Sequence, residues 1–177
     1  RRCGDARRAA RRNRQGEVPP SAVANGKPVR TGGPNLEPHV ETLANLLVES
    51  AKSRETLTYG TLSRRLQKRT GKLIPPIGMG RPLEHVHNAV RDAAASIGIV
   101  APPLTVIVEN GQAEEPGRGM SPLLQEWLEQ TDAAARMRED VADAVRRDAA
   151  APPHAVRYAQ SKVFEFGEWD QVVGAIP

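Results

Sequence analysis

Apolar residues recur at helical spacing over three separate stretches in the first half of the chain. Between Pro38 and Arg54 they fall three or four positions apart, which is the period of an amphipathic helix. A second stripe begins after Thr58, a residue suited to cap a helix, and ends at Gly71, which suits left-handed backbone. A third stripe begins at Pro82. The pattern therefore predicts three helices, with a short extended link before the second and a loop rich in proline and glycine before the third.

The second half of the chain combines strand and helix signals. The run 104–108 is rich in β-branched residues and predicts a buried strand. Two turn signals follow, at 110–111 and 116–119. Apolar residues spaced between 121 and 148 predict one long helix, and 163–166 is expected to form a closing strand. The predicted fold class is therefore α+β, with a small β-sheet and a long C-terminal helix.

The N-terminal segment differs in composition from the rest. Residues 1–35 are rich in Arg, Ala, Gly, Pro and Asn and hold almost no large apolar side chains, so they cannot bury enough surface to offset their chain entropy. We expect a disordered basic arm over 1–35 and a single α+β domain over 36–177. The arm is interpreted either as an electrostatic contact for nucleic acid or as a solubilising or mistranslated leader.

No apolar run approaches the roughly 20 residues that span a bilayer, and the N-terminus lacks the apolar stretch of a secretory signal. The sequence therefore predicts a cytoplasmic protein with no membrane partner.

Charge is distributed unevenly along the chain. The formal net charge is +4 and the pI is about 9.6. Nine basic and two acidic residues lie in 1–30, and the same numbers lie between Lys52 and Arg91. From Asp92 onward there are seven basic and fourteen acidic residues. The arm and the middle segment are thus the two parts whose charge favours an anionic polymer.

The titratable side chains form no recognisable catalytic pattern. The single cysteine, Cys3, excludes a disulfide within the chain and a cysteine metal cluster. His85 and His87 are two residues apart, which on a helix turns them about 200° from each other, so they would not share a metal. His85 is expected to be a core histidine. We therefore predict no catalytic residue, no metal and no cofactor.

The order of the predicted helices and strand resembles that of a known type of domain. Three helices followed by a strand, with Thr58–Ser63 opening the second helix, resemble the winged-helix DNA-binding domain of alkylguanine-DNA alkyltransferases and alkyltransferase-like proteins. In that family a threonine-tyrosine-glycine segment opens a helix-turn-helix, and an arginine-containing helix enters the DNA; Gly80–Leu83 stands in the corresponding place. The family's reactive Pro-Cys-His-Arg segment would fall at Pro102–Thr105, where cysteine, histidine and arginine are missing. The resemblance therefore implies a winged-helix-like DNA-binding fold without alkyl transfer.

A second resemblance covers about residues 56–175. The chain is similar in outline to small bacterial proteins of unassigned function, which share a Tyr-Gly opening, a Pro-Pro-Leu-Thr segment, a Pro-Gly-x-Gly turn and a Val-Phe-x-Phe-x-x-Trp-like ending. Here these are Tyr59-Gly60, Pro102–Thr105, Pro116–Gly119 and Val163–Trp169. This resemblance implies a shared architecture and brings no activity with it.

Nine polar or basic residues are the candidates for contact with DNA. Those of the second helix suit phosphates, those of the third suit base edges and phosphates, and the last would reach the minor groove from a wing turn. The alternatives are solvated helix faces and a plain hairpin turn. The candidates are Arg64, Arg65, Lys68, Arg69, Arg81, His87, Asn88, Arg91 and Arg118.

The function predicted from these observations is non-catalytic DNA binding, through a helix-turn-helix-like basic surface and the basic arm. One alternative is a protein-interaction module of a bacterial multi-protein system, in which the acidic helix Glu126–Asp148 meets a partner. Another is an enzyme of undetermined class, whose site is assembled from residues far apart in sequence.

Overall fold

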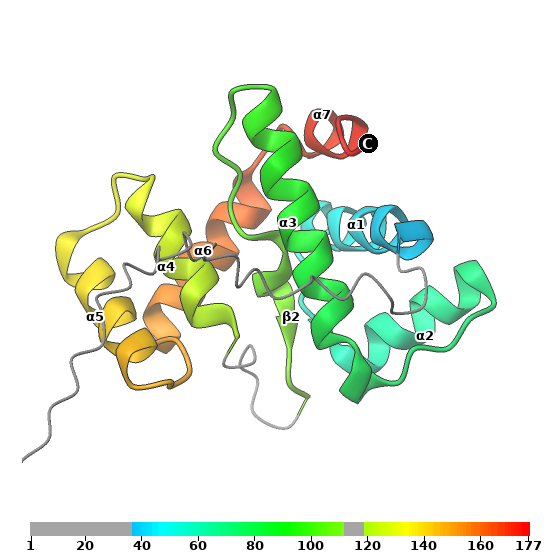
Figure 1. Ribbon diagram of the computed structural model, residues 1–177, viewed down its shortest axis with the longest axis horizontal. Helices are drawn as coiled ribbons and strands as arrows, with labels where there is room; N and C mark the ends of the chain where they lie inside the picture. Colours follow the sequence, from blue (N-terminus) through cyan, green and yellow to red (C-terminus); the bar gives the residue numbers. More distant parts are fainter. Residues whose placement is uncertain (1–36, 112–118) are drawn as a thin grey trace, which may run out of the picture. The chain divides into compact units, whose positions relative to one another are not determined.

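Residues 37–111 and 119–177 are the part of the chain that the computed structural model describes (Figure 1). This part is mostly helical, with seven α-helices, two 3-10 turns and two strands of two residues each. The elements in order are α1 Glu37–Lys52, β1 Leu57–Thr58, α2 Tyr59–Thr70, η1 Pro76–Gly78, α3 Gly80–Ser96, η2 Leu104–Ile107, β2 Val108–Glu109, α4 Met120–Glu129, α5 Ala135–Arg146, α6 Pro153–Glu165 and α7 Trp169–Gly174.

Helix α1 lies at the centre of the packing. It contacts α2, α3, α6, α7 and η2, and its apolar stripe, which includes Leu43 and Leu47, is fully buried. The three helices predicted from spacing in the first half of the sequence are all present. The stripe of α3 includes Leu83, Val86 and Val90 as expected, because these positions recur every three to four residues.

The strand predicted at 104–108 is wrong over most of its length. Leu104–Ile107 form the 3-10 turn η2, and only Val108 continues into β2. All four residues of η2 are buried, and α1, α3 and α6 contact this turn. A continuous apolar run signals burial but does not by itself distinguish a strand from a helical turn. Here helices surround the run, and β1 offers only two residues for pairing.

The sheet is correspondingly small. Strands β1 and β2 run parallel, with Leu57 opposite Val108 and Thr58 opposite Glu109. This pairing holds the start of α2 against the end of η2, so its role is to position α2 rather than to form a layer of the core.

The long C-terminal helix is also a wrong prediction. The chain ends α4 at Glu129 and restarts as α5 at Ala135, and the two helices pack against each other. Thr131 donates its hydroxyl to the carbonyl of Leu128, 3.3 Å away, which competes with helix continuation at the break. Reversal of the chain lets α5 bury Val141 against the core, which one straight helix could not do.

The predicted closing strand at 163–166 is helical instead. Helix α6 runs without a break from Pro153 to Glu165, with Val156, Ala159 and Val163 on its buried stripe. The spacing of these three residues fits the helical period, which outweighs the strand preference of Val and Phe in this short segment.

Two expectations lie largely outside the described residues. The basic arm over 1–35 does so entirely, and the wing turn at 116–119 does so except for Gly119. The division into arm and domain and the winged-helix assignment therefore stay predictions. Within the described ranges, no helix is long and apolar enough to cross a membrane.

Candidate nucleic-acid interface

Helix α2 carries four of the predicted DNA contacts, and its ends are well defined by the sequence. Thr58 caps the first turn, because its hydroxyl accepts a hydrogen bond from the Thr61 amide at 3.1 Å. Gly71 ends the helix with φ of 73°, a left-handed conformation that favours glycine. Leu62 and Leu66 are fully buried, which fixes the rotation of α2 and divides its basic residues between two sides.

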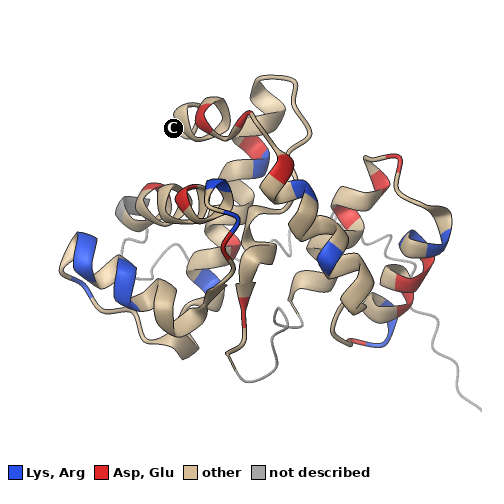
Figure 2. Cartoon of the chain, turned by 180° about the vertical axis from the view of Figure 1, so that it is seen from behind, with Lys and Arg blue, Asp and Glu red and all other residues tan. Residues whose placement is uncertain are grey.

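Two of the four basic side chains are turned toward α1. Arg65 forms hydrogen bonds of 3.0 and 3.1 Å with the carboxylate of Glu55, and a third bond of 3.0 Å with the buried hydroxyl of Ser50. Arg69 pairs with Glu49 at 2.7 Å. Figure 2 shows Lys and Arg positions along α2 and Asp and Glu positions along α1, which packs against it. Arg65 and Arg69 thus link two helices of this domain.

The other two basic side chains of α2 point away from α1. Arg64 and Lys68 are four residues apart, share the outer face and are exposed. Arg64 forms a hydrogen bond of 3.3 Å with the hydroxyl of Thr61. Among the described residues, neither side chain has an acidic partner.

The exposed face of α3 carries, beside the exposed acid Glu84, the residues Arg81, His85 and Asn88. These residues are spaced i, i+4 and i+7, so they lie on one side of the helix. Arg81 and His85 are exposed and Asn88 is half-buried. The expectation that His85 belongs to the core is wrong, because it lies opposite the buried stripe. His87 belongs to that stripe instead.

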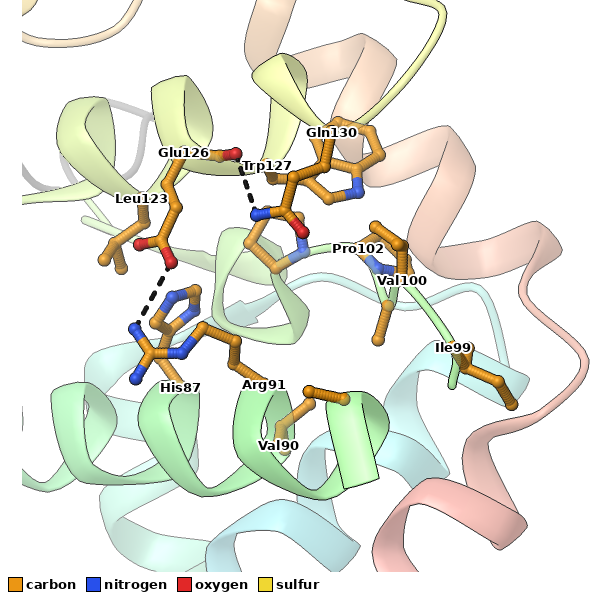
Figure 3. A pocket seen from close by; sticks show the side chains of 13 residues that line it. His87, Val90, Arg91, Ile99, Val100, Pro102, Leu123, Glu126, Trp127 and Gln130 are labelled. Carbon is orange, nitrogen blue, oxygen red and sulfur yellow. Dashed lines mark hydrogen bonds and ion pairs between the residues drawn. The ribbon is translucent and has the colours of Figure 1, made fainter. Parts of the chain in front are cut away.

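His87 and Arg91 therefore lie apart from the outer face of α3. Figure 3 shows both pointing from α3 toward α4, with Glu126 and Trp127 across a small cavity. The cavity has room of about 60 Å³ for water-sized molecules. Only 7% of His87 is exposed, and its Nε2 atom has no hydrogen-bond partner within residues 37–111 and 119–177. The guanidinium of Arg91 pairs with Asp92 at 2.9 Å and with Glu126 at 3.3 Å. Neither residue is on the surface that Arg81 occupies.

The position of His87 could have been found from the sequence. It lies four residues after Leu83 and three before Val90, which places it on the apolar stripe of its helix. His85 lies two residues after Leu83 and two before His87, a spacing that places it on the opposite side of the helix. Applying the helical period to each histidine separately would have distinguished them.

Burial makes the charge of His87 unfavourable. Desolvation lowers the pKa of His87 below the usual 6.5, and the nearby Arg91 lowers it further, whereas Glu126 and Asp92 act in the opposite direction. The unfolded chain therefore binds this proton more readily than the folded one. The neutral ring is fully compatible with folding above pH 6.5, and stability is lost as the pH falls through and below that value.

We expect the free energy of unfolding to decrease between pH 7.5 and pH 5.5 more steeply in the natural protein than in His87→Leu, which has no group to protonate at this site. Urea denaturation at three pH values measures this difference. His85→Gln is the matched control, since it removes an exposed histidine from the same helix. Equal pH slopes for the natural protein and His87→Leu would contradict the prediction.

The basic residues between Lys52 and Arg91 differ in whether they have an acidic partner. Of the nine between Lys52 and Arg91, four form ion pairs, namely Lys52 with Asp170, Arg65, Arg69 and Arg91. Four of the remaining five follow one another along α2, the loop after it and the start of α3. We call these four, which are exposed and have no acidic partner in the described residues, the outer cations: Arg64, Lys68, Lys72 and Arg81.

Two further expectations concern contacts outside this surface. Arg118 lies outside the described residues. Among the described residues, no three His, Cys, Asp or Glu side chains come together as a metal ion would require.

Comparison with known proteins gives no assignment. Neither a protein-family model, nor a curated protein, nor a solved structure matches this chain.

Proposed function

We propose that this chain is a DNA-binding protein and that α2, the loop after it and α3 act as a helix-turn-helix-like unit in a winged-helix-like domain. The observation that carries the proposal is the set of outer cations, which no acid of the described domain neutralises. They lie in a stretch, residues 56–83, without Asp or Glu, and the next acid is Glu84, one helical turn after Arg81 on the exposed face of α3. With the four outer cations beside one exposed acid, this surface attracts a polyanion.

The two helices would have different tasks in this arrangement. Arg64 and Lys68 on the outer face of α2 would contact phosphates, which position a protein without reading sequence. His85 and Asn88 on α3 carry donors and acceptors suited to base edges, and Arg81, one turn before His85, suits a phosphate. They lie in the N-terminal half of α3, the part of a recognition helix that contacts bases in helix-turn-helix proteins.

Arg65 and Arg69 are paired with Glu55 and Glu49, so the proposed DNA-binding site contains fewer residues than the sequence predicted. To reach a phosphate, Arg69 would have to leave the carboxylate of Glu49 on α1, and Arg65 would have to leave the carboxylate of Glu55 and the hydroxyl of Ser50. Exposed ion pairs of this kind contribute at most about 1 kcal/mol each, so their main effect is to place the guanidinium groups away from the outer face. The proposed site therefore consists of the outer cations with His85 and Asn88.

A fluorescence anisotropy titration of the full chain against a labelled duplex of about 20 base pairs tests the proposal. We expect binding at 50 mM salt that weakens at 200 mM, because each phosphate contact releases condensed counterions. Contact by the outer cations alone predicts a slope of log K against log salt of about −3 to −4. Absence of binding at 50 mM salt, or binding that salt leaves unchanged, would overturn the proposal.

A second candidate function, binding of a partner protein, rests on a different surface. Val100 is 49% exposed and adjoins both the His87 cavity and an open cleft of about 570 Å³, and Trp127 and Phe166 also line that cleft. Exposed apolar side chains beside a cleft are typical of interaction sites. This candidate predicts a partner that co-purifies after nuclease treatment and is lost in Val100→Asp. Retention of the partner in that variant would argue against this surface.

A further inference from the structure

The loop between α2 and α3 exposes an unbroken apolar segment. Residues 73–77, which we call the apolar loop, are Leu, Ile, Pro, Pro and Ile, and none of them is buried. Leu73 is 59% exposed and Ile77 is 98% exposed. The other large hydrophobic residues with comparable exposure in the described ranges, Ile97 and Val100, reach 41% and 49%. Ile77 thus presents almost its whole side chain to solvent.

The apolar loop is held in place from both sides. Pro75 and Pro76 restrict the backbone, and the amide of Gly78 donates to the carbonyl of Pro75 at 2.8 Å to close the turn η1. The hydroxyl of Ser63 on α2 donates to the carbonyl of Ile74 at 2.5 Å. Met79, directly after the turn, is fully buried and anchors the C-terminal side of the loop. Ile77 is therefore presented by a fixed turn, and little conformational entropy would be lost when it binds.

The surroundings of the apolar loop are basic. Lys72 precedes it and Arg81 follows four residues after Ile77, and both are outer cations. Ile77 and Gly80 line the same surface hollow with Tyr59, so the tip of the loop lies beside the start of α3. An apolar tip between cations is complementary to a partner that has negative charge outside and an apolar interior.

We propose that Ile77 acts as an apolar wedge that enters a base step of duplex DNA while Lys72 and Arg81 hold the flanking phosphates. This inference rests on the proposed function. Proteins that insert isoleucine, leucine or proline between base pairs partly unstack the step and kink the duplex. The stacked bases would offer Ile77 an apolar surface to contact. The phosphates would offer Lys72 and Arg81 the negatively charged partners that the described part of the protein does not supply.

An anionic lipid surface would offer similar chemistry, and the structure favours DNA over it. Membrane binding by a surface segment scales with the apolar area that it buries. Here Ile77, in a turn of three residues, is almost fully exposed and Leu73, before the turn, is about half exposed, and the segment has no long amphipathic face. A single stiff side chain matches the gap of one base step better than it matches a lipid layer.

The test compares Ile77→Ala with the unsubstituted chain of 177 residues. Ile77 is almost fully exposed, so its truncation removes no packing contact and leaves the fold unchanged. Ile97→Ala, at the opposite end of α3, is the matched control for loss of an exposed isoleucine. The duplex carries a donor and an acceptor dye at its ends to report the kink, and 2-aminopurine within the site to report unstacking.

We expect the natural protein and Ile97→Ala to raise both energy transfer and 2-aminopurine fluorescence, and Ile77→Ala to raise neither. The affinity of Ile77→Ala should fall less than about tenfold, because phosphate contacts remain. A duplex already bent by a two-nucleotide bulge should restore that affinity, which loss of an ordinary contact would not explain.

Three outcomes would overturn the inference. Binding without a change in either signal leaves the proposed function standing and removes the wedge. Signals in Ile77→Ala that rise as much as those in the natural protein do the same. Absence of DNA binding removes both, and if anionic phospholipid vesicles then bind the natural protein but not Ile77→Ala, the apolar loop belongs to a membrane contact.

Discussion

Replacement of Trp169 by alanine should lower the free energy of unfolding by about 3–5 kcal/mol, the range for removal of a large aromatic side chain from a core. Trp169 is only 1% exposed, and its ring meets that of Phe166 edge to face with centroids 4.6 Å apart. Its Nε1 atom donates to the carbonyl of Val163 at 2.9 Å. That carbonyl lies in the last turn of α6, where the helix itself supplies no donor. One side chain therefore both fills the core and completes the end of α6.

Urea denaturation followed by circular dichroism measures this loss without depending on tryptophan fluorescence. Trp169→Phe separates the two contributions, since it keeps most of the ring and loses the donor, and it should cost less than the alanine variant. Gln171→Ala, at an exposed position of the same short helix, is the control and should change stability by no more than about 0.5 kcal/mol. A loss below about 1 kcal/mol in Trp169→Ala would show that α7 contributes little to the fold.

Removal of three outer cations together should weaken duplex binding by roughly 100-fold or more near 0.1 M salt. The variant is R64A/K68A/R81A. If each side chain contacts one phosphate, each contributes close to one unit of the salt slope, and three such contacts are worth about that factor. The slope of log K against log salt should therefore fall in magnitude by about 3.

The control for this variant removes the same charge from elsewhere in the domain. Arg136 and Arg138 on α5 and Arg157 on α6 are exposed and have no acidic partner among the described residues. R136A/R138A/R157A lowers the net charge equally and should change affinity only a few-fold. Equal losses in the two variants would mean that binding depends on net charge alone and that the surface of α2 and α3 has no special role.

The candidate site could be predicted only in part from the sequence. The basic character of α2 was plain from the sequence, and so was its rotation, because Leu62 and Leu66 define the buried side. What the sequence did not contain was the position of α1 and of the segment after it, whose Glu49 and Glu55 pair with Arg69 and Arg65 across 20 and 10 residues of chain. Partners at such separations depend on how two helices pack, and local spacing carries no information about this.

The errors in fold share a related cause. The runs 104–108 and 163–166 are rich in residues with strand preference, yet helices surround the first and the second continues the buried stripe of α6. Strand preference is a measure of fit to a pleated, half-buried surface, and no such surface is available here beyond the two residues of β1. The break between α4 and α5 likewise depends on the packing of α5 against the core.

The sequence by itself determined the three helices of the first half, the cap at Thr58, the left-handed end at Gly71 and the concentration of positive charge between Lys52 and Arg91. These features follow from helical period, local hydrogen bonding and counting, which need no knowledge of distant residues. Only the tertiary structure decided which cations remain unpaired, that His87 rather than His85 is buried, and that Ile77 projects into solvent from a fixed turn. Burial and pairing are properties of two elements in contact, so they are set when the helices pack.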